Sequence, residues 1–599
     1  MRRAFLFNTH FRLIRQHFSH FFKKYFHSFA PIYHTRMNFR NCRIYFSKSF
    51  IVLLFFLLAG FYSSAQQYLL PLDRQSAGYF DATINDVSFF HANGFHTSFR
   101  PYLLNNFPST SDSNEVLIIE TNSQSAEKTK PNGFFPCVKY HLFDSNLINV
   151  NKDDLILTVN PLIDFEYGND FEHDRRTYSN SRGFRVTGTL GKKFSFETDY
   201  SENQVLFPQW IIDHVKEVQA FVPGSGKIKV YKTTGAYDFP SESGLIAWHA
   251  NKHFDLVFGQ GKNFIGDGYR SLLLSDNASA YPFLRLTTSA WKFQYTNMWA
   301  QMFDAKEKSQ LGEGFRKKYI ALHYLSTLIG RKIEIGLFEA VIWQAQDSVT
   351  YRGFDAQYLN PIIFYHSVQW NFGSPDNSML GWNFRWNICH HLTFYNQFFL
   401  DDFNLSRTKK EKGYFGNKYA YQLGLKSYDA FKVKGFFLQA EYNEIWPYTY
   451  GHKLTTINYA HANQALADPV GSNSREMLGF IQYHFKNWFI GTEVMYVMRG
   501  IDSDTGNVGH DIFNSDYNIQ DAYKQGTFVG TWGNYVGQGI PQTILYVSAK
   551  VNYLLNRHNN LLAEVSYTYR QQNTDGKLST TNFITFGIKT SLFNHYYDF

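Results

Sequence analysis

The feature that most restricts the fold is a strict alternation of apolar and polar residues near the end of the chain. In residues 545–553, Leu, Val, Ala, Val and Tyr occupy the odd positions, while Tyr546, Ser548, Lys550 and Asn552 occupy the even ones. Successive side chains of a strand point to opposite faces, so this segment has one apolar and one polar face. A second alternating run, 561–570, follows the short polar connector 556–560. The two runs predict an antiparallel hairpin.

The same alternation recurs further upstream. Runs of this kind cover 184–200, 333–337, 392–400, 436–443 and 481–496, with tight turns at 191–193 and 486–487, and Asn396 departs from the apolar face of its run. Longer connectors lie at 207–243, 339–378, 401–418, 443–478 and 498–542. One face of a soluble β-sandwich alternates in the same way. Strands of about ten residues with alternately short and long connectors instead favour a transmembrane barrel, whose long loops face outward and whose short turns face the periplasm.

Composition supports a membrane barrel. Phe, Tyr and Trp make up 19% of the 599 residues, yet no apolar run after residue 65 reaches half the roughly twenty residues that a membrane helix needs. We therefore predict an all-β fold: a transmembrane outer-membrane antiparallel β-barrel over residues 151–599. At roughly 22–25 residues per strand and connector, the barrel would have about 18 strands.

Two local patterns add detail to this barrel. Apolar residues at 211, 215, 218 and 222 have helical spacing, which predicts a short helix in a loop or plug within 208–221. The chain ends on Phe599 with aromatic residues before it, as is typical of outer-membrane barrels, but the apolar parity changes near Asn594. The change predicts either a bulge near Asn594 or a last strand that ends there.

The first 65 residues have the pattern of an export signal. They carry ten Lys and Arg and no acidic residue, then an apolar run from Phe50 to Phe61, then Ser63, Ser64 and Ala65. This order is typical of a cleaved secretory signal peptide, and the run is short for the alternative, a membrane anchor. A start at Met37 would give a signal of ordinary length, with residues 1–36 untranslated. The mature chain would then be exported to the cell outer membrane.

Removing the leader changes the charge balance. The whole chain has 58 basic and 50 acidic residues, and without the ten basic residues of the leader 48 basic residues remain against the 50 acidic ones. The mature chain therefore offers no argument for nucleic acid as a partner. It keeps two cysteines, Cys137 and Cys389, which could pair in an oxidising compartment, and it has no Cys/His cluster with zinc spacing.

The segment between the leader and the barrel is irregular. Residues 109–129 are rich in Ser, Asn, Glu and Lys without any period, as in an exposed loop. We expect residues 66–150 to form a small N-terminal head, either periplasmic or a plug.

A glycine-rich stretch, Gly259 to Asp276, stands out between two strand-like runs. Glycines at 259, 261, 266 and 268 predict a backbone that turns sharply or runs close to another part of the chain. Gly261 and Gly266 have the spacing of a phosphate-binding loop, but Asp267 and Gly268 stand where Lys and Ser or Thr are required. Nucleotide binding is therefore not predicted.

The same stretch, GQGKNFIGDGYRSLLLSDNASAYPFLRL, resembles the gliding-motility RemB family of Bacteroidetes, as do HTSFRPY at 96–102 and LTVNPLIDFEYGND at 157–170. More distantly the chain resembles the capsule-assembly Wzi family of outer-membrane β-barrels. These resemblances cover most of the chain after residue 66. They imply a surface protein of a gliding and adhesion apparatus or a lectin-like anchor for capsule, and a Wzi-like barrel would have eighteen strands.

Nothing in the sequence predicts an enzyme. His390 and His391 are adjacent and would point to opposite faces of a strand, and the paired acids Asp153-Asp154 and Asp401-Asp402 are typical of solvated turns. No G-x-S-x-G or H-E-x-x-H motif occurs. We therefore name no catalytic residue, no metal ligand and no cofactor.

Eight residues are candidates for ligand binding. Trp370, Trp446 and Trp532 stand beside Asn, Tyr and Thr in long loops, a mixture that suits sugars. For any single Trp, a place in the aromatic girdle of the barrel is the more common role. Polar groups flank the tight turns of the glycine-rich stretch, which could line or close the lumen. They are Asp267, Tyr269, Arg270, Asp276 and Asn277. For this set we favour a structural role, an Arg270–Asp276 ion pair, over a ligand or partner site.

These observations predict a non-enzymatic outer-membrane protein of cell-surface adhesion or gliding that contacts surface polysaccharide. A Wzi-like lectin for capsule or exopolysaccharide anchoring is the first alternative, and a porin-like channel is the second. The expected partners are outer-membrane lipid, surface polysaccharide and, through the RemB resemblance, the gliding or secretion machinery.

Overall fold

The computed structural model describes residues 69–75, 95–103, 133–152, 154–217, 221–231, 234–308, 314–346, 351–363, 376–409, 412–503, 506–515 and 530–599. The predicted leader at 1–65, the start at Met37 and the loop at 109–129 lie outside the described residues.

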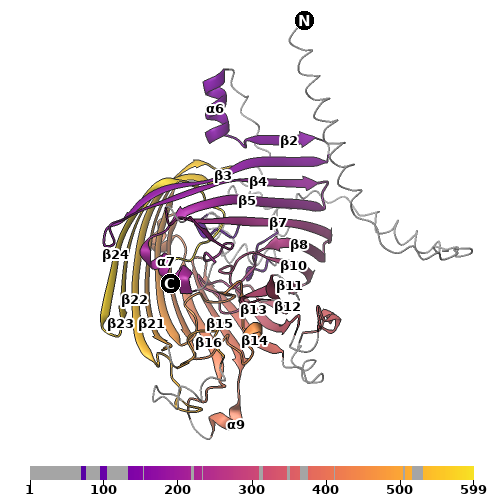
Figure 1. The fold of residues 1–599 in the computed structure, drawn as a ribbon. Coiled ribbons are helices and arrows are strands. Elements are labelled where there is room, and N and C mark those ends of the chain that lie inside the picture. Colours follow the sequence, from indigo (N-terminus) through magenta and orange to yellow (C-terminus); the bar gives the residue numbers. More distant parts are fainter. Residues whose placement is uncertain are drawn as a thin grey trace, which may run out of the picture. The chain divides into compact units, whose positions relative to one another are not determined.

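Within the described part, eighteen antiparallel strands close into a barrel (Figure 1), as the alternation predicts. The strands are β3 (Leu155–Asp170), β4 (Arg175–Leu190), β5 (Phe194–Leu206), β7 (Tyr237–Asn251), β8 (Phe254–Gly261), β10 (Tyr281–Ala290), β11 (Phe293–Lys308), β12 (Phe315–Ile329), β13 (Ile333–Gln344), β14 (Asn377–Cys389), β15 (Leu392–Asp402), β16 (Lys418–Ser427), β17 (Phe436–Ile445), β20 (Ser474–Phe485), β21 (Trp488–Ile501), β22 (Ile540–Asn556), β23 (Leu561–Thr574) and β24 (Lys577–Thr590). The barrel closes where β24 pairs with β3, for example Phe586 with Tyr167.

Shorter elements lie at the edges and inside the barrel. β2 (Ile148–Lys152) pairs with the first part of β3, and β6 (Lys229–Val230) pairs with β7. Among the described residues, the α-helices are α6 (Phe134–Phe143), α7 (Gln209–Glu217) and α9 (Leu405–Thr408), and α7 is the helix predicted within 208–221. In the part of the chain that the structure describes, no helix is both long and apolar enough to cross a membrane.

The predicted hairpin at 545–570 is formed by β22 and β23, with Tyr553 opposite Ala563 and Ser548 opposite Thr568. The even residues of β22 face the lumen and the odd residues face outward, as predicted. The predicted tight turns at 191–193 and 486–487 also occur, and every strand of the wall is antiparallel to its neighbours. Most of the short turns lie at one end of the barrel, which we call the short-turn end. Most of the long connectors lie at the other end, the long-loop end, together with the short turns 171–174 and 575–576.

The outward face of the barrel is apolar. Phe258, Val565 and Phe586 each expose more than half of their surface. Aromatic rings gather next to the short turns, where Phe194 stacks on Trp248 at 5.9 Å and Trp488 meets Tyr553 at 4.8 Å. Such a surface, bounded by rings, suits the hydrocarbon core and the interface of a bilayer. Asn396 does face outward, where it accepts a hydrogen bond from the indole of Trp382 at 3.0 Å.

The change in apolar parity near Asn594 arises because the last strand ends before this residue, not because of a bulge. β24 ends at Thr590, and residues 591–599 leave the wall and enter the lumen. There Phe599 packs against α7, and Figure 1 shows α7 beside the C-terminus. The two cysteines do not form a disulfide: both Cys137 and Cys389 are free thiols.

A charge placed on the outward face is expected to cost far more than one placed in the lumen. Val494, in the middle of β21, faces outward and is 42% exposed. Val494→Arg is expected to lower the free energy of unfolding by about 2–4 kcal/mol, because the guanidinium would enter hydrocarbon. Urea titration of the refolded barrel in liposomes measures the change. The control is Ser548→Arg, a lumen-facing site on the neighbouring strand; equal costs at both sites would contradict a lipid-facing β21.

Candidate functional site

The glycine-rich stretch is the connector between β8 and β10, and it folds into the lumen. Its short strand β9 (Phe264–Ile265) pairs with β1 (Phe99–Arg100) from the N-terminal region, and Leu272, Leu273 and Leu274 are fully buried. Five segments meet here, and we call them the plug: 69–75, 95–103, 262–280, 450–470 and 591–599. The prediction that this stretch lines or closes the lumen therefore agrees with its position.

Two glycines let this backbone approach the barrel wall. Gly266 has a φ of 135°, and a Cβ atom there would lie 2.2 Å from Nε2 of Gln397. A Cβ atom on Gly268 would lie 2.6 Å from Oε1 of Gln422 and 2.7 Å from Oε2 of Glu441. Any larger residue would push the plug away from the wall side chains that hold it.

Wall side chains take over the hydrogen bonds that the irregular plug backbone cannot make to itself. Glu441 on β17 accepts from the backbone N–H groups of Tyr269 at 2.6 Å and Arg270 at 3.0 Å. Gln397 on β15 donates to the carbonyl of Ile265 at 2.9 Å and accepts from the N–H of Leu272 at 2.8 Å. These contacts satisfy buried backbone groups, which would otherwise destabilise the fold.

Arg270 is the central cation of the plug and is 1% exposed. Its guanidinium lies 2.9 Å from Glu476 on β20 and 3.0 Å from Asp598 in the C-terminal segment, with Asp468 at 3.9 Å. Burial lowers the pKa of Arg270, but the charges of Asp598 and Glu476 outweigh it, so the net shift is upward. Burial raises the pKa of Asp468 to about 6, an effect that Arg270 opposes. The carboxylates of Asp598 and Glu476 thus stabilise the charged form of Arg270, and Arg270 in turn stabilises the charged form of Asp468.

The predicted Arg270–Asp276 ion pair is wrong. Asp276 instead accepts hydrogen bonds from Nδ2 of Asn594 at 2.8 Å and from the hydroxyl of Tyr596 at 2.6 Å. Sequence spacing suggested the pair because the two residues are close in the chain. The plug loop turns between them, so each reaches a different part of the C-terminal segment.

The other candidates in this stretch also contact the chain itself. Asp267 accepts from Thr97 at 3.0 Å and from Asn383 at 3.1 Å. The hydroxyl of Tyr269 donates to Asp598 at 3.0 Å, and Asn277 donates to the carbonyl of Ala465 at 3.2 Å. The structure therefore brings all five polar candidates of the glycine-rich stretch into the plug.

The N-terminal region contributes a second cation and several hydroxyl groups. Arg74 donates to the carbonyls of Gly268, at 3.1 Å, and Tyr269, and its guanidinium lies 4.4 Å from the Tyr269 ring centroid. Ser98 donates to Glu334 on β13 at 2.6 Å. Sequence reasoning missed Arg74, Glu441 and Glu476, since no local motif marks a residue whose partner lies hundreds of positions away.

The three tryptophan candidates are not brought together. Trp446 follows β17 and stacks on Tyr419 at 4.8 Å, in an outward-facing row that continues through Phe398 to Trp382. Trp532 lies in the long-loop region, 5.1 Å from the ring of Tyr414. Trp370 lies outside the described residues.

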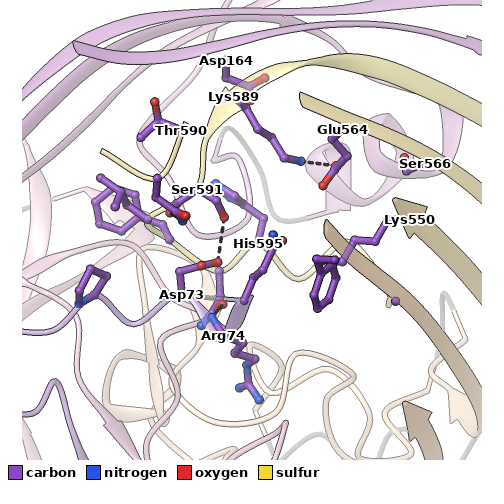
Figure 2. A pocket seen from close by; sticks show the side chains of 18 of the residues that line it. Asp73, Arg74, Asp164, Lys550, Glu564, Ser566, Lys589, Thr590, Ser591 and His595 are labelled. Atoms are coloured by element: carbon purple, nitrogen blue, oxygen red, sulfur yellow. Dashed lines mark hydrogen bonds and ion pairs between the residues drawn. The ribbon is translucent and has the colours of Figure 1, made fainter. Parts of the chain in front are cut away.

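A cavity of about 1780 Å³, which we call the vestibule, runs beside the plug from the short-turn end to residues 205–211, where β5 leads into α7. Tyr269, Tyr596 and Asp598 of the plug border it on one side, and the turn residues 557–560 border it on the other. Figure 2 shows Lys589 donating to Glu564 and Ser591 donating to Asp73, the latter at 2.9 Å. Lys589 also lies 3.0 Å from Glu166. The lining of the vestibule combines charges of both signs, such as Lys589 and Glu564, with many apolar and aromatic side chains, such as Phe207 and Trp210.

No group of three His, Cys, Asp or Glu residues in the described part of the chain is arranged to hold a metal ion. His390 and His391 form the turn between β14 and β15, with their ring centroids 6.5 Å apart.

Comparisons with known proteins support the fold. No family model matches the chain, and no curated protein matches it. A solved structure that does match is Wzi, described as an outer-membrane protein involved in group 1 capsule assembly in Escherichia coli and as a carbohydrate-binding β-barrel. It is 12% identical, with a TM-score of 0.50 over 88% of this chain and 100% of that one. OprD from Pseudomonas aeruginosa matches at 10% identity and a TM-score of 0.36, over 74% of this chain and 95% of its own. OccAB2 from Acinetobacter baumannii matches at 10% identity and 0.38, over 72% and 97%.

The likeness to Wzi shows a shared barrel fold and agrees with the Wzi-like part of the sequence resemblance. The RemB resemblance has no support from these comparisons.

Removing the charge of Arg270 is expected to loosen the plug. Arg270→Met would leave Glu476 and Asp598 buried without a cation, at a cost of about 3–5 kcal/mol. We expect a lower urea midpoint and intermittent ion conductance in planar bilayers, because the plug would leave the lumen more often. Lys252→Met, at an exposed turn, is the control. Unchanged conductance and stability for Arg270→Met would contradict the central role of this residue.

A second prediction tests the close approach of the plug to the wall. Gly266→Ala is expected to destabilise the barrel by about 1–3 kcal/mol, since the new methyl group would displace Gln397. The control is Gly576→Ala in the β23–β24 turn, where φ is also positive, 80°, but no atom lies within 4 Å of the position that the added methyl group would take. Urea unfolding of both variants separates the steric cost from the backbone cost, and equal effects would show that only φ matters.

Proposed function

We propose that this chain is a non-enzymatic outer-membrane barrel that contacts surface polysaccharide at its long-loop end, in cell-surface adhesion or gliding. The observation that carries the proposal is the plug. Five segments of the chain fill the middle of the lumen and use its polar wall residues as partners. A protein built in this way acts at its surface rather than as an open pore.

The plug argues against the porin-like alternative. Glu334, Gln397 and Glu441 face the lumen and would line the channel of a porin. Here their polar atoms bond to the plug instead, and Gln397 is fully buried. In this proposal Asp267, Tyr269, Arg270, Asp276 and Asn277 hold the plug in place, and they influence ligands only through it.

Location in the outer membrane is supported by two features. The outward face is apolar with aromatic rings near the short turns. The leader has the pattern of a cleaved signal peptide. The long loops would then face the exterior, and the short-turn end of the vestibule would face the periplasm.

A Wzi-like role in anchoring capsule or exopolysaccharide is the second candidate. It is favoured by the shared fold, since Wzi is described as carbohydrate-binding and involved in capsule assembly. Both candidates require polysaccharide contact at the outer face. The gliding role, with the gliding or secretion machinery as partner, rests on the RemB resemblance of the glycine-rich stretch.

Of the two tryptophan candidates that the structure describes, Trp532 is the better placed for polysaccharide contact, because it lies in a loop at the long-loop end. Trp446 belongs to an outward-facing row of rings and takes the girdle role in this proposal.

The proposal is tested with the refolded mature chain in planar bilayers and in a pull-down with surface polysaccharide from the cells that produce it. We expect no steady large conductance, and retention of the barrel on immobilised polysaccharide. Steady conductance that polysaccharide does not alter would favour the porin and contradict the proposal. Release of capsule from a deletion strain would separate the anchoring role from a defect in adhesion or gliding.

A further inference from the structure

Two long loops that are far apart in the sequence are joined at the long-loop end. One is 403–417, between β15 and β16, and the other is 530–539, which leads into β22. The N–H of Phe415 donates to the carbonyl of Thr531 at 3.1 Å, and the N–H of Gly533 donates to Lys412 at 3.0 Å. The N–H of Asn534 donates to Gly413 at 3.0 Å, and its side chain donates to the same carbonyl at 2.9 Å. We call the surface of these paired loops the platform.

The platform depends on a close approach of the two backbones. Gly413 has a φ of 69°, and a Cβ atom there would lie 2.5 Å from the backbone of Asn534. Asn534 is buried and also accepts a hydrogen bond from the fully buried Gln538 at 3.0 Å. The rings and charges that the loops carry are therefore presented by a fixed framework rather than by two independent loops.

Aromatic rings cover part of the platform. Tyr414 lies between Trp532, 5.1 Å away, and Phe415, also 5.1 Å away, measured between ring centroids. Tyr414 and Trp532 are half-buried, so each keeps a free surface, and Tyr535 is 53% exposed. Partly exposed rings held by their neighbours suit stacking against the C–H faces of sugar rings.

Cations lie next to these rings. Arg407, Lys409 and Lys412 are exposed, and the Arg407 guanidinium lies 5.8 Å from the Tyr414 ring centroid. The short helix α9 that carries Arg407 is fixed at its start, where Asn404 accepts from the N–H of Arg407 at 3.0 Å. Figure 1 shows α9 projecting beyond the ends of β15 and β16. No carboxylate of the described residues forms an ion pair with Arg407, Lys409 or Lys412.

The sequence of the loop has the same bias. Residues 403–417 contain four basic residues and one acid, and residues 530–539 contain no charged residue. A mature chain with slightly more acids than bases thus carries a local excess of positive charge where it also presents rings. Such a combination favours an anionic polymer with apolar ring faces over a neutral one.

We propose that the platform binds acidic polysaccharide: sugar rings stack on Tyr414, Trp532 and Tyr535, and carboxylates of the polymer pair with Arg407, Lys409 and Lys412. This inference rests on the proposed function, since it names the site and the charge of the polysaccharide. A lipid headgroup is a less suitable partner, because α9 projects beyond the strands rather than lying along the apolar wall.

The test measures binding of the full refolded barrel in detergent to polygalacturonate, alginate and hyaluronate, with dextran as the neutral polymer. The wild type is expected to bind at least one acidic polymer, and more weakly as salt rises from about 50 to 500 mM, because salt screens exposed charges. Arg407→Gln combined with Lys412→Gln should weaken binding by about tenfold or more. Trp532→Leu should weaken it at all salt concentrations. Lys577→Gln, an exposed lysine at the same end of the barrel, should leave binding unchanged.

The outcomes separate this inference from the proposed function. Equal binding of dextran and the acidic polymers would overturn the charge preference and leave polysaccharide binding standing. Acid-polymer binding that none of the platform variants changes would overturn the location. Binding to lipopolysaccharide micelles alone, or to no polysaccharide at all, would overturn the inference, and the second result would count against the proposed function as well. Resistance of each variant to SDS before heating checks that the barrel is folded.

Discussion

The structure depends on how the backbone polar groups of an irregular segment find hydrogen-bond partners inside the barrel. Residues 262–280 have little regular secondary structure, so their backbone groups need partners other than one another. Glu441, Gln397 and Gln422 supply these partners from the wall, and Arg270 draws Glu476, Asp598 and Asp468 around one cation. Because a buried ion pair is costly to break from either side, the contact at Arg270 couples the loop, the wall and the C-terminal segment to one another.

The plug explains why the lumen looks unlike that of an open channel. Polar residues that face the lumen are compatible with a lumen filled by water and with a lumen filled by a segment of the chain. The alternation alone does not distinguish these two cases. The glycines decide it here, because Gly266 and Gly268 remove the side chains that would hold the loop away from the wall. Polar side chains of the wall that would otherwise meet water and ions instead form hydrogen bonds with the backbone of the plug.

The sequence was sufficient to predict the wall but not the interior. The alternation of a strand and the length of a turn are local properties, because they involve only residues that are adjacent in the sequence. The strands β22 and β23 and their turn could therefore be predicted from residues 545–570 alone. Asp267, Tyr269, Arg270, Asp276 and Asn277 could be singled out because they flank glycines. Their partners could not be predicted: Arg270 and Glu476 are 206 positions apart, and Arg270 and Asp598 are 328 apart. The Arg270–Asp276 pair was inferred because the two residues are close in the sequence. The loop bends between them, so that Arg270 contacts Asp598 and Asp276 contacts Tyr596.

The position of the C-terminal segment has a consequence for the order of assembly. Residues 591–599 follow β24 directly, so they can enter the lumen in their final position only when β24 is in place beside β3. Asp598 then reaches Arg270, and Phe599 reaches α7. Residues 591–599 thus act as a latch that engages once the ring of strands is complete. In a barrel in which β24 has not yet paired with β3, Arg270 would lack the carboxylate of Asp598. The plug would then be incompletely held beneath the surface loops.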